Sequence, residues 1–200
     1  MSELLAFARL GFEHVTEPGA LDHVLFLVAL AAVYGPRDWR SAAWVVSAFT
    51  VGHSLTLALA VGGVLPLSGA LVEFLIPLTI VAAGVDNLLA PGGTAAASRR
   101  RARPALAATF GLVHGAGFAG YLRSVLVDRV AVPLLGFNLG VELGQLVVLA
   151  AAVSVLAGVD RLLARVRLPS AASPLRMRTV AVSAAVALVA ARWAVERTPW

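Results

Sequence analysis

The sequence contains no cysteine and no lysine, and only 14% of its 200 residues are charged. Without cysteine, no disulfide or thiolate chemistry is available to the protein. A soluble domain usually has about a quarter of its residues charged, whereas 60% of this chain is hydrophobic and its mean hydropathy is +0.88. These values exclude an ordinary soluble domain. They predict an all-α polytopic membrane protein, because helices of about 20 apolar residues match a hydrocarbon layer ~30 Å thick.

Six apolar segments predict a bundle of about six transmembrane helices in a single domain that covers residues 1–200. They lie at about 19–35, 40–63, 70–90, 105–126, 132–158 and 178–195. Ahead of the first segment, residues 3–12 alternate apolar and charged side chains at helical spacing. This pattern is typical of an interfacial helix that lies along the membrane surface.

All sixteen basic residues are arginines, and most of them lie between the apolar segments. The net charge of +5 therefore indicates membrane topology and not a nucleic-acid partner. The loops after the first, third and fifth segments hold eleven arginines: Arg37, Arg40, Arg99, Arg100, Arg101, Arg103, Arg161, Arg165, Arg167, Arg176 and Arg178. The opposite side holds Arg9, Arg123, Arg129, Arg192 and Arg197. Because arginine-rich loops stay in the cytoplasm, both termini are predicted to be periplasmic.

Polar side chains recur at matching depths when each helical residue is given a rise of 1.5 Å. Asp22 and Glu73 lie near the outer ends of their segments, whereas His53, His114 and Glu142 lie near the middle. A carboxylate at mid-membrane costs about 2.5–3.5 kcal/mol on insertion scales, so Glu142 needs a partner, a proton or an ion. We therefore predict that these helices direct their polar groups at one column in the outer half of the bilayer.

The stretch "FNLGVELGQL" carries two stripes of residues at helical spacing. Asn138, Glu142 and Gln145 form a polar stripe. Three glycines at every fourth residue, from Gly136 to Gly144, form the second stripe on a different face, where a neighbouring helix can approach closely. The polar stripe is therefore expected to face other helices and not lipid.

The ligand types favour a borderline divalent metal ion. The histidines are His14, His23, His53 and His114, and all of them lie in or beside the outer half of the apolar segments. Imidazole nitrogens with carboxylate and amide oxygens suit Ni²⁺, Co²⁺ or Zn²⁺. A soft Cu⁺ site is disfavoured because cysteine is absent, and hard ions such as Mg²⁺ use oxygen ligands only.

Each polar residue also has an ordinary structural explanation. A single intramembrane histidine is more often a hydrogen-bonding partner between helices, Glu142 can be neutral, and Asp22 can cap a helix. Four histidines and three carboxylates at matching depth favour a metal site over these separate explanations. The predicted ligands are His23, His53, His114, Glu142, Asp22 and Glu73. Asn138 and Gln145 are predicted to be weak ligands or to support the ligands by hydrogen bonds.

Five sequence blocks resemble, in this order, the conserved blocks of the HupE/UreJ family. They are "LDHVLFLVAL", "FTVGHSLTLALA", "VEFLIPLTIVAAGVDN", "FGLVHGAGFAG" and "FNLGVELGQL", and the likeness covers roughly residues 11–150. The resemblance implies a six-helix protein of the bacterial inner membrane, taken to be a secondary nickel or cobalt permease that serves hydrogenase or urease.

Two family motifs match only in part. The first-helix motif is His-x5-Asp-His; Asp22 and His23 match it, but seven residues separate His14 from Asp22, which leaves His14 doubtful as a ligand. The fourth-helix motif, Phe-His-Gly-x-Ala-His-Gly-x-Glu, is represented by His114 and Gly115. The chain therefore resembles the less characterised branch of the family.

The predicted function is uptake of a divalent transition-metal ion by a secondary transporter that is not an enzyme, with nickel as the favoured ion. No nucleotide-binding motif occurs, so the driving force is the membrane potential, a proton gradient or a partner protein. The expected partners are the lipid bilayer and the metal ion, and a homo-oligomer is compatible with the sequence. The alternatives are an intramembrane zinc enzyme, which lacks its usual His-Glu-x2-His motif here, and a metal- or heme-binding membrane subunit.

Overall fold

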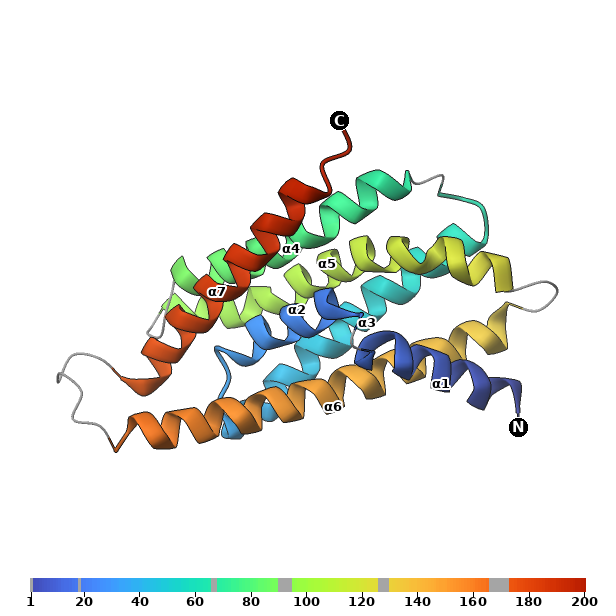
Figure 1. Ribbon diagram of the computed structural model, residues 1–200. Coiled ribbons are helices and arrows are strands. Elements are labelled where there is room, and N and C mark those ends of the chain that lie inside the picture. Colours follow the sequence, from blue (N-terminus) through green and yellow to red (C-terminus); the bar gives the residue numbers. More distant parts are fainter. Residues whose placement is uncertain (1, 18, 66–67, 90–94, 126–129, 166–172) are drawn as a thin grey trace.

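The computed structural model describes residues 2–17, 19–65, 68–89, 95–125, 130–165 and 173–200. These ranges form seven α-helices and one 3-10 turn, without a strand (Figure 1). The elements are α1 (Glu3–Thr16), α2 (Leu21–Ala31), η1 (Pro36–Asp38), α3 (Trp39–Val61), α4 (Gly69–Leu89), α5 (Ala95–Val125), α6 (Ala131–Leu163) and α7 (Pro174–Glu196). The predicted all-α class is therefore confirmed.

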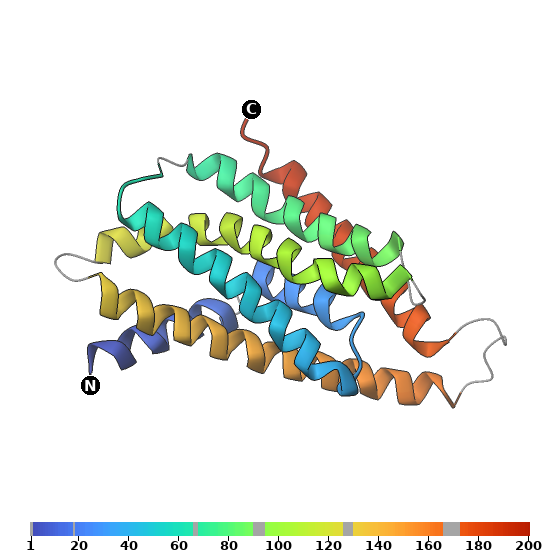
Figure 2. The same cartoon turned by 180° about the vertical axis from the view of Figure 1, so that it is seen from behind.

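Five of the helices are long and apolar enough to cross a membrane. The apolar spans are Trp39–Val61, Gly69–Leu89, Ala102–Val125, Ala131–Leu162 and Pro174–Glu196. They correspond to the five predicted segments from 40–63 onward. The long helices form one elongated bundle in both ribbon views (Figures 1 and 2). The protein is accordingly a multi-pass membrane protein.

The first predicted segment, 19–35, contains only the 11-residue helix α2, which is shorter than the ~20 residues that span a bilayer. Helices α1 and α2 follow one another along the bundle, with a break between Thr16 and Leu21 (Figures 1 and 2). Helix α1, expected along the membrane surface, instead packs against α6. Its amphipathic pattern has another explanation, because Arg9 and Glu13 pair with each other at 2.7 Å on its exposed side.

Side chains from α7 satisfy the carbonyl groups at the C-terminal end of α2. The Thr179 hydroxyl donates to the carbonyl oxygen of Ala32 at 2.8 Å, and the Arg178 guanidinium donates to that of Tyr34 at 2.9 Å. Asp160 of α6 pairs with the buried Arg178. A helix end away from water needs such partners for its last carbonyl groups. The short helix α2 is thereby anchored to α6 and α7.

The sequence predicts that a neighbouring helix approaches the glycine stripe of α6. In the structure that helix is α1. A Cβ atom added at Gly140 would lie 1.9 Å from the carbonyl oxygen of Ala8, and one added at Gly11 would lie 2.0 Å from that of Phe137. No side chain larger than hydrogen fits such contacts without displacement of a helix. The backbones of α1 and α6 therefore touch directly.

Helices α3 and α5 are joined by a second set of close glycine contacts. A Cβ atom at Gly111 would lie 2.1 Å from the carbonyl oxygen of Phe49, and one at Gly115 would lie 2.3 Å from that of His53. Both glycines flank His114 in the sequence. The close approach therefore brings the histidines of α3 and α5 to the same level of the bundle.

Candidate metal centre

Histidines from three helices converge beside the break between α1 and α2. His14 lies in the last turn of α1, His23 in the first turn of α2, and His53 within α3. One ring nitrogen of each lies within 4.8 Å of the other two. Nitrogen ligands bind a zinc-like ion at about 2.0–2.1 Å, so a bound ion would draw the three rings slightly closer together. These three residues are called the histidine cluster below.

A fourth imidazole adjoins the histidine cluster. The ring centroids of His23 and His114 are 5.3 Å apart, and His114 is 2% exposed. The buried ring nitrogens without a hydrogen-bond partner among the described residues are Nε2 of His14, His23 and His53 and Nδ1 of His114. A buried polar atom without a partner costs about 1–3 kcal/mol, a penalty that a coordinated metal ion removes. The free nitrogens are thus available as ligands.

Neighbouring oxygen atoms fix which nitrogen of His23 and of His53 is free. Asp22 Oδ1 lies 3.1 Å from Nδ1 of His23, and Asn138 Oδ1 lies 3.4 Å from Nδ1 of His53. The Asn138 amide nitrogen donates to the carbonyl oxygen of Leu134 at 2.8 Å, which turns the amide oxygen toward the ring. In both histidines Nδ1–H therefore donates to oxygen and Nε2 presents its lone pair, as in metal-ligating histidines generally.

His114 is oriented by Thr79 of α4. The Thr79 hydroxyl donates to the carbonyl oxygen of Ile76 at 2.7 Å, and its oxygen lies 3.0 Å from Nε2 of His114. Since the hydroxyl hydrogen is already used, the ring must donate through Nε2–H. Nδ1 of His114 then keeps its lone pair and is the free nitrogen.

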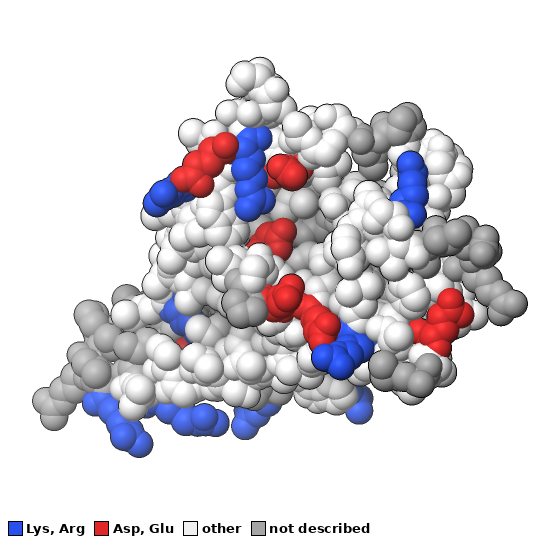
Figure 3. All heavy atoms as spheres, turned by 45° about the vertical axis from the view of Figure 1, so that its right-hand side comes forward, with Lys and Arg blue, Asp and Glu red and all other residues white. Residues whose placement is uncertain are grey.

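A cavity of about 410 Å³ opens beside the histidines. Its lining residues are His14, Asp22, His23, Glu73, Ile76, His114, Gly117, Phe118 and Arg197. It shares Glu73 and Gly117 with a hollow of about 350 Å³, and His14 and Phe118 with another of about 310 Å³. Acidic side chains gather around a hollow on this face of the molecule (Figure 3). Because carboxylates attract cations, Asp22 and Glu73 can gather a divalent ion here.

Aromatic side chains cover the opposite side of the histidines. The Phe49 ring lies 5.1 Å from that of His114, and the Phe26 ring lies 4.9 Å from that of Phe49. Phe26 follows His23 along α2, and Phe49 precedes His53 along α3, so both lie toward the arginine-rich end of the bundle. The histidines are therefore open toward the acidic face and closed toward the other end.

Glu142 and Gln145 lie in a separate polar contact between α3 and α6. The Ser47 hydroxyl donates to Glu142 Oε1 at 2.5 Å, and the Thr50 hydroxyl contacts both Glu142 Oε2 and Gln145 Oε1, the latter at 2.9 Å. The structure thus brings His23, His53, His114, Asp22 and Glu73 to one site, together with His14, and it gives Glu142 hydroxyl partners instead.

Four relevant residues lie outside the predicted ligand set: His14, Ser47, Thr50 and Thr79. Thr50 lies three residues before His53 and therefore close to its helix face, and Ser47 lies three residues before Thr50. A hydroxyl residue one turn from a predicted ligand in an apolar helix is the signal that would find Thr50, whereas Ser47 and Thr79 each lie six residues from the nearest predicted ligand of their own helix. From the sequence His14 is a doubtful ligand, because its spacing from Asp22 differs from that of the family motif.

The arrangement suits a borderline divalent cation. Three or four neutral imidazoles with one nearby carboxylate leave coordination positions for water, so an ion can enter and leave without losing its whole hydration shell. The donor set offers no thiolate for a soft ion.

Comparison with known protein families identifies the family of the chain. The family model described as HupE / UreJ protein matches residues 1–197. No curated protein and no solved structure matches the chain. The matched stretch includes every helix that contributes a histidine, and it extends beyond the stretch on which the sequence resemblance depends. The chain therefore belongs to the HupE/UreJ family of membrane proteins, which is associated with nickel and cobalt transport.

Proposed function

We propose that the protein is a secondary transporter that takes up a divalent transition-metal ion through the histidine cluster, with nickel as the preferred ion. The observation that carries this proposal is the set of buried imidazole nitrogens that have no hydrogen-bond partner in the described part of the chain, beside a cavity that opens to an acidic face. A structural role for these histidines would use their second nitrogens in hydrogen bonds. A family associated with transport, and not with catalysis, supports the same conclusion.

The ion would pass from carboxylates to imidazoles. Asp22 and Glu73 would gather the hydrated ion in the outer cavity, and His14, His23 and His53 would replace part of its water, with His114 beside them. Asn138 supports His53, whereas Glu142 and Gln145, which the sequence predicts as a ligand and a weak ligand, lie further along the seam between α3 and α6. A divalent ion that moves inward down 100 mV gains ~4.6 kcal/mol, which is enough to drive uptake.

The direction of transport depends on topology. We propose that the protein lies in a bacterial inner membrane with both termini and the acidic face in the periplasm. A reporter fused after Trp200 is then expected to be active only outside the cytoplasm, because the arginine-rich loops stay inside. Activity of a cytoplasmic reporter at this position would reverse the orientation and turn the proposed uptake path into an exit path.

Metal selectivity tests the transport proposal directly. Purified protein in proteoliposomes is expected to accumulate Ni²⁺, and Co²⁺ or Zn²⁺ less strongly, whereas Mg²⁺ and Ca²⁺ should neither enter nor compete, because imidazole nitrogen prefers borderline ions. The measurement is uptake with a metal-sensitive dye inside the vesicles, with protein-free vesicles as the control. Equal uptake of Mg²⁺ would show that the histidines do not select the ion.

A further inference from the structure

A further, much smaller cavity lies beside Phe26, on the side that faces away from the histidines. Its volume is about 30 Å³, room for roughly two water molecules. Residues of α2, α3, α4 and α5 line it, and they include Phe26 and Phe110 on the side of the histidines and Asp86, Asn87 and Arg103. The way from the histidines toward the arginine-rich end therefore narrows at this point.

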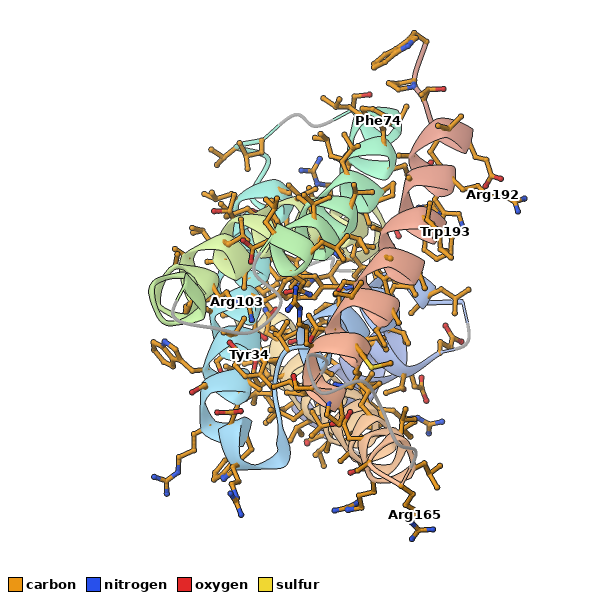
Figure 4. The ribbon with its side chains drawn as sticks, turned by 90° about the vertical axis from the view of Figure 1, so that its left-hand side faces the viewer. Tyr34, Phe74, Arg103, Arg165, Arg192 and Trp193 are labelled. Atoms are coloured by element: carbon orange, nitrogen blue, oxygen red, sulfur yellow. The ribbon has the colours of Figure 1, made fainter. Side chains whose placement is uncertain are left out.

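Arg103 fills this narrow region. Its Nε lies 3.6 Å from Asp86 Oδ2, and its Nη2 donates to Asn87 Oδ1 at 3.0 Å. The guanidinium carbon lies 5.7 Å from the centre of the Tyr34 ring, and Figure 4 shows the Arg103 and Tyr34 side chains close together. The Arg103 side chain is only 10% exposed. A cation is thus held by a carboxylate oxygen, an amide oxygen and an aromatic ring.

The Asn87 amide is fixed in position. The Asn87 amide nitrogen donates to the carbonyl oxygen of Ala29 on α2 at 2.8 Å and to the Ser183 hydroxyl on α7 at 3.2 Å. These two bonds direct the Asn87 amide oxygen toward Arg103. Since these bonds do not involve Arg103, the Asn87 amide oxygen stays in place when the guanidinium leaves, and beside Asp86 it offers a place for another cation.

We propose that Arg103 is a tethered cation that closes the inner end of the ion path, and that Asp86 and Asn87 form the exit site which a divalent cation occupies when Arg103 leaves it. This inference rests on the proposed transport function and names the step that follows the histidine cluster. Two cations cannot share one carboxylate and one amide at close range without strong repulsion. Departure of Arg103 therefore accompanies passage of the ion.

The absence of cysteine makes the test direct, because a single introduced thiol reports access. Ala83 lines the inner cavity and Gly120 lines an outer hollow, where an added Cβ meets no atom within 4 Å. In inside-out vesicles without metal, Ala83→Cys is expected to react slowly with a membrane-impermeant methanethiosulfonate. Adding Arg103→Gln should speed this reaction about tenfold, because loss of one partner destabilises a largely buried ion pair. The rates with a cationic and an anionic reagent are compared, so that the effect of the lost arginine charge on attraction of the reagent is separated from its effect on access to the cysteine.

Matched variants separate closure from general disruption. Arg165→Gln removes an exposed arginine that points away from the bundle in Figure 4, and it should leave the Ala83→Cys rate unchanged. Asp86→Asn should speed the reaction as Arg103→Gln does, and Arg103→Lys should fall between, because it keeps the charge without the two-pronged contact. If Arg103→Gln opens the inner end, Gly120→Cys should be labelled from the outer side more slowly in the presence of Arg103→Gln than in its absence.

Three outcomes would overturn the proposal: an unchanged Ala83→Cys rate in Arg103→Gln, equal acceleration by Arg165→Gln, or faster labelling of both cysteines. The last result would indicate unfolding, because alternating access moves the two rates in opposite directions. The labelling needs no metal, so its failure is distinct from a failure of wild-type vesicles to take up Ni²⁺, which would contradict the transport function instead.

Discussion

His53→Ala is expected to abolish both Ni²⁺ uptake and the thermal stabilisation of the protein by Ni²⁺. One of its ring nitrogens converges with those of His14 and His23, its Nε2 has no hydrogen-bond partner among the described residues, and the side chain is completely buried. Loss of one of three imidazoles leaves a two-nitrogen site that competes poorly with water. The apo-protein should lose little stability from this loss of hydrogen bonding, since interhelical hydrogen bonds average ~0.6 kcal/mol. Uptake and the melting temperature with and without Ni²⁺ are the measurements.

Asp22→Asn provides a graded comparison. The Asp22 carboxylate orients His23 and lines the outer cavity, so its neutralisation should weaken metal affinity about 10–100-fold without abolishing binding. Glu142→Gln should have a smaller effect, because a glutamine oxygen still accepts a hydrogen bond from Ser47 or Thr50. A loss as complete as that of His53→Ala would instead assign Glu142 to the coordination sphere.

The control for these variants is Glu196→Gln. Glu196 is exposed and pairs with Arg192 on the surface of α7. It should keep wild-type uptake and Ni²⁺ stabilisation. Wild-type behaviour of His53→Ala in both measurements would refute the ligand assignment and leave the histidines with a packing role only.

Gly140→Ala is expected to destabilise the protein by about 1–3 kcal/mol and to remove most of the Ni²⁺ stabilisation. The new methyl group would lie 1.9 Å from the carbonyl oxygen of Ala8, so α1 must move away from α6. His14 is carried by α1, and its ring leaves the histidine cluster with that movement. The measurement is the melting temperature with and without Ni²⁺.

Gly158→Ala is the matched control for this change on the same helix. An added Cβ at Gly158 meets no atom within 4 Å, so alanine should be neutral or slightly stabilising there. Equal melting temperatures for the two variants would contradict the direct backbone contact between α1 and α6.

The sequence predicts the long helices and the glycine contact well, because both depend on local patterns. A run of apolar residues specifies a span, and glycines at every fourth residue specify a face. The depth of each histidine follows from the rise of a helix, and His53 and His114 do lie at one level beside His23. These inferences need no knowledge of which helices are neighbours.

The remaining features depend on how the helices are rotated and where the chain breaks. Glu142 is predicted at the depth of His53, but depth leaves its direction around the helix axis open, and the carboxylate meets the α3 hydroxyls instead. His14 reaches the histidine cluster only because the chain turns between α1 and α2, which motif spacing does not encode. Arg103 is hidden for a similar reason: in the sequence it is one of several loop arginines, and its contacts with Asp86 and Asn87 are set by α4.

The anchoring of the first two helices has a consequence for biosynthesis. Helix α1 rests on glycines of α6, and the carbonyl groups of Ala32 and Tyr34, directly after α2, are satisfied by Thr179 and Arg178 of α7, more than 140 residues later in the chain. While the ribosome is still making the middle of the protein, these partners do not exist. Helix α1 can therefore dock only once α6 has been inserted, and the end of α2 gains its partners only once α7 has followed. A chain whose synthesis stops early cannot hold its first two histidines in place, so an unfinished copy would not sequester a toxic metal ion.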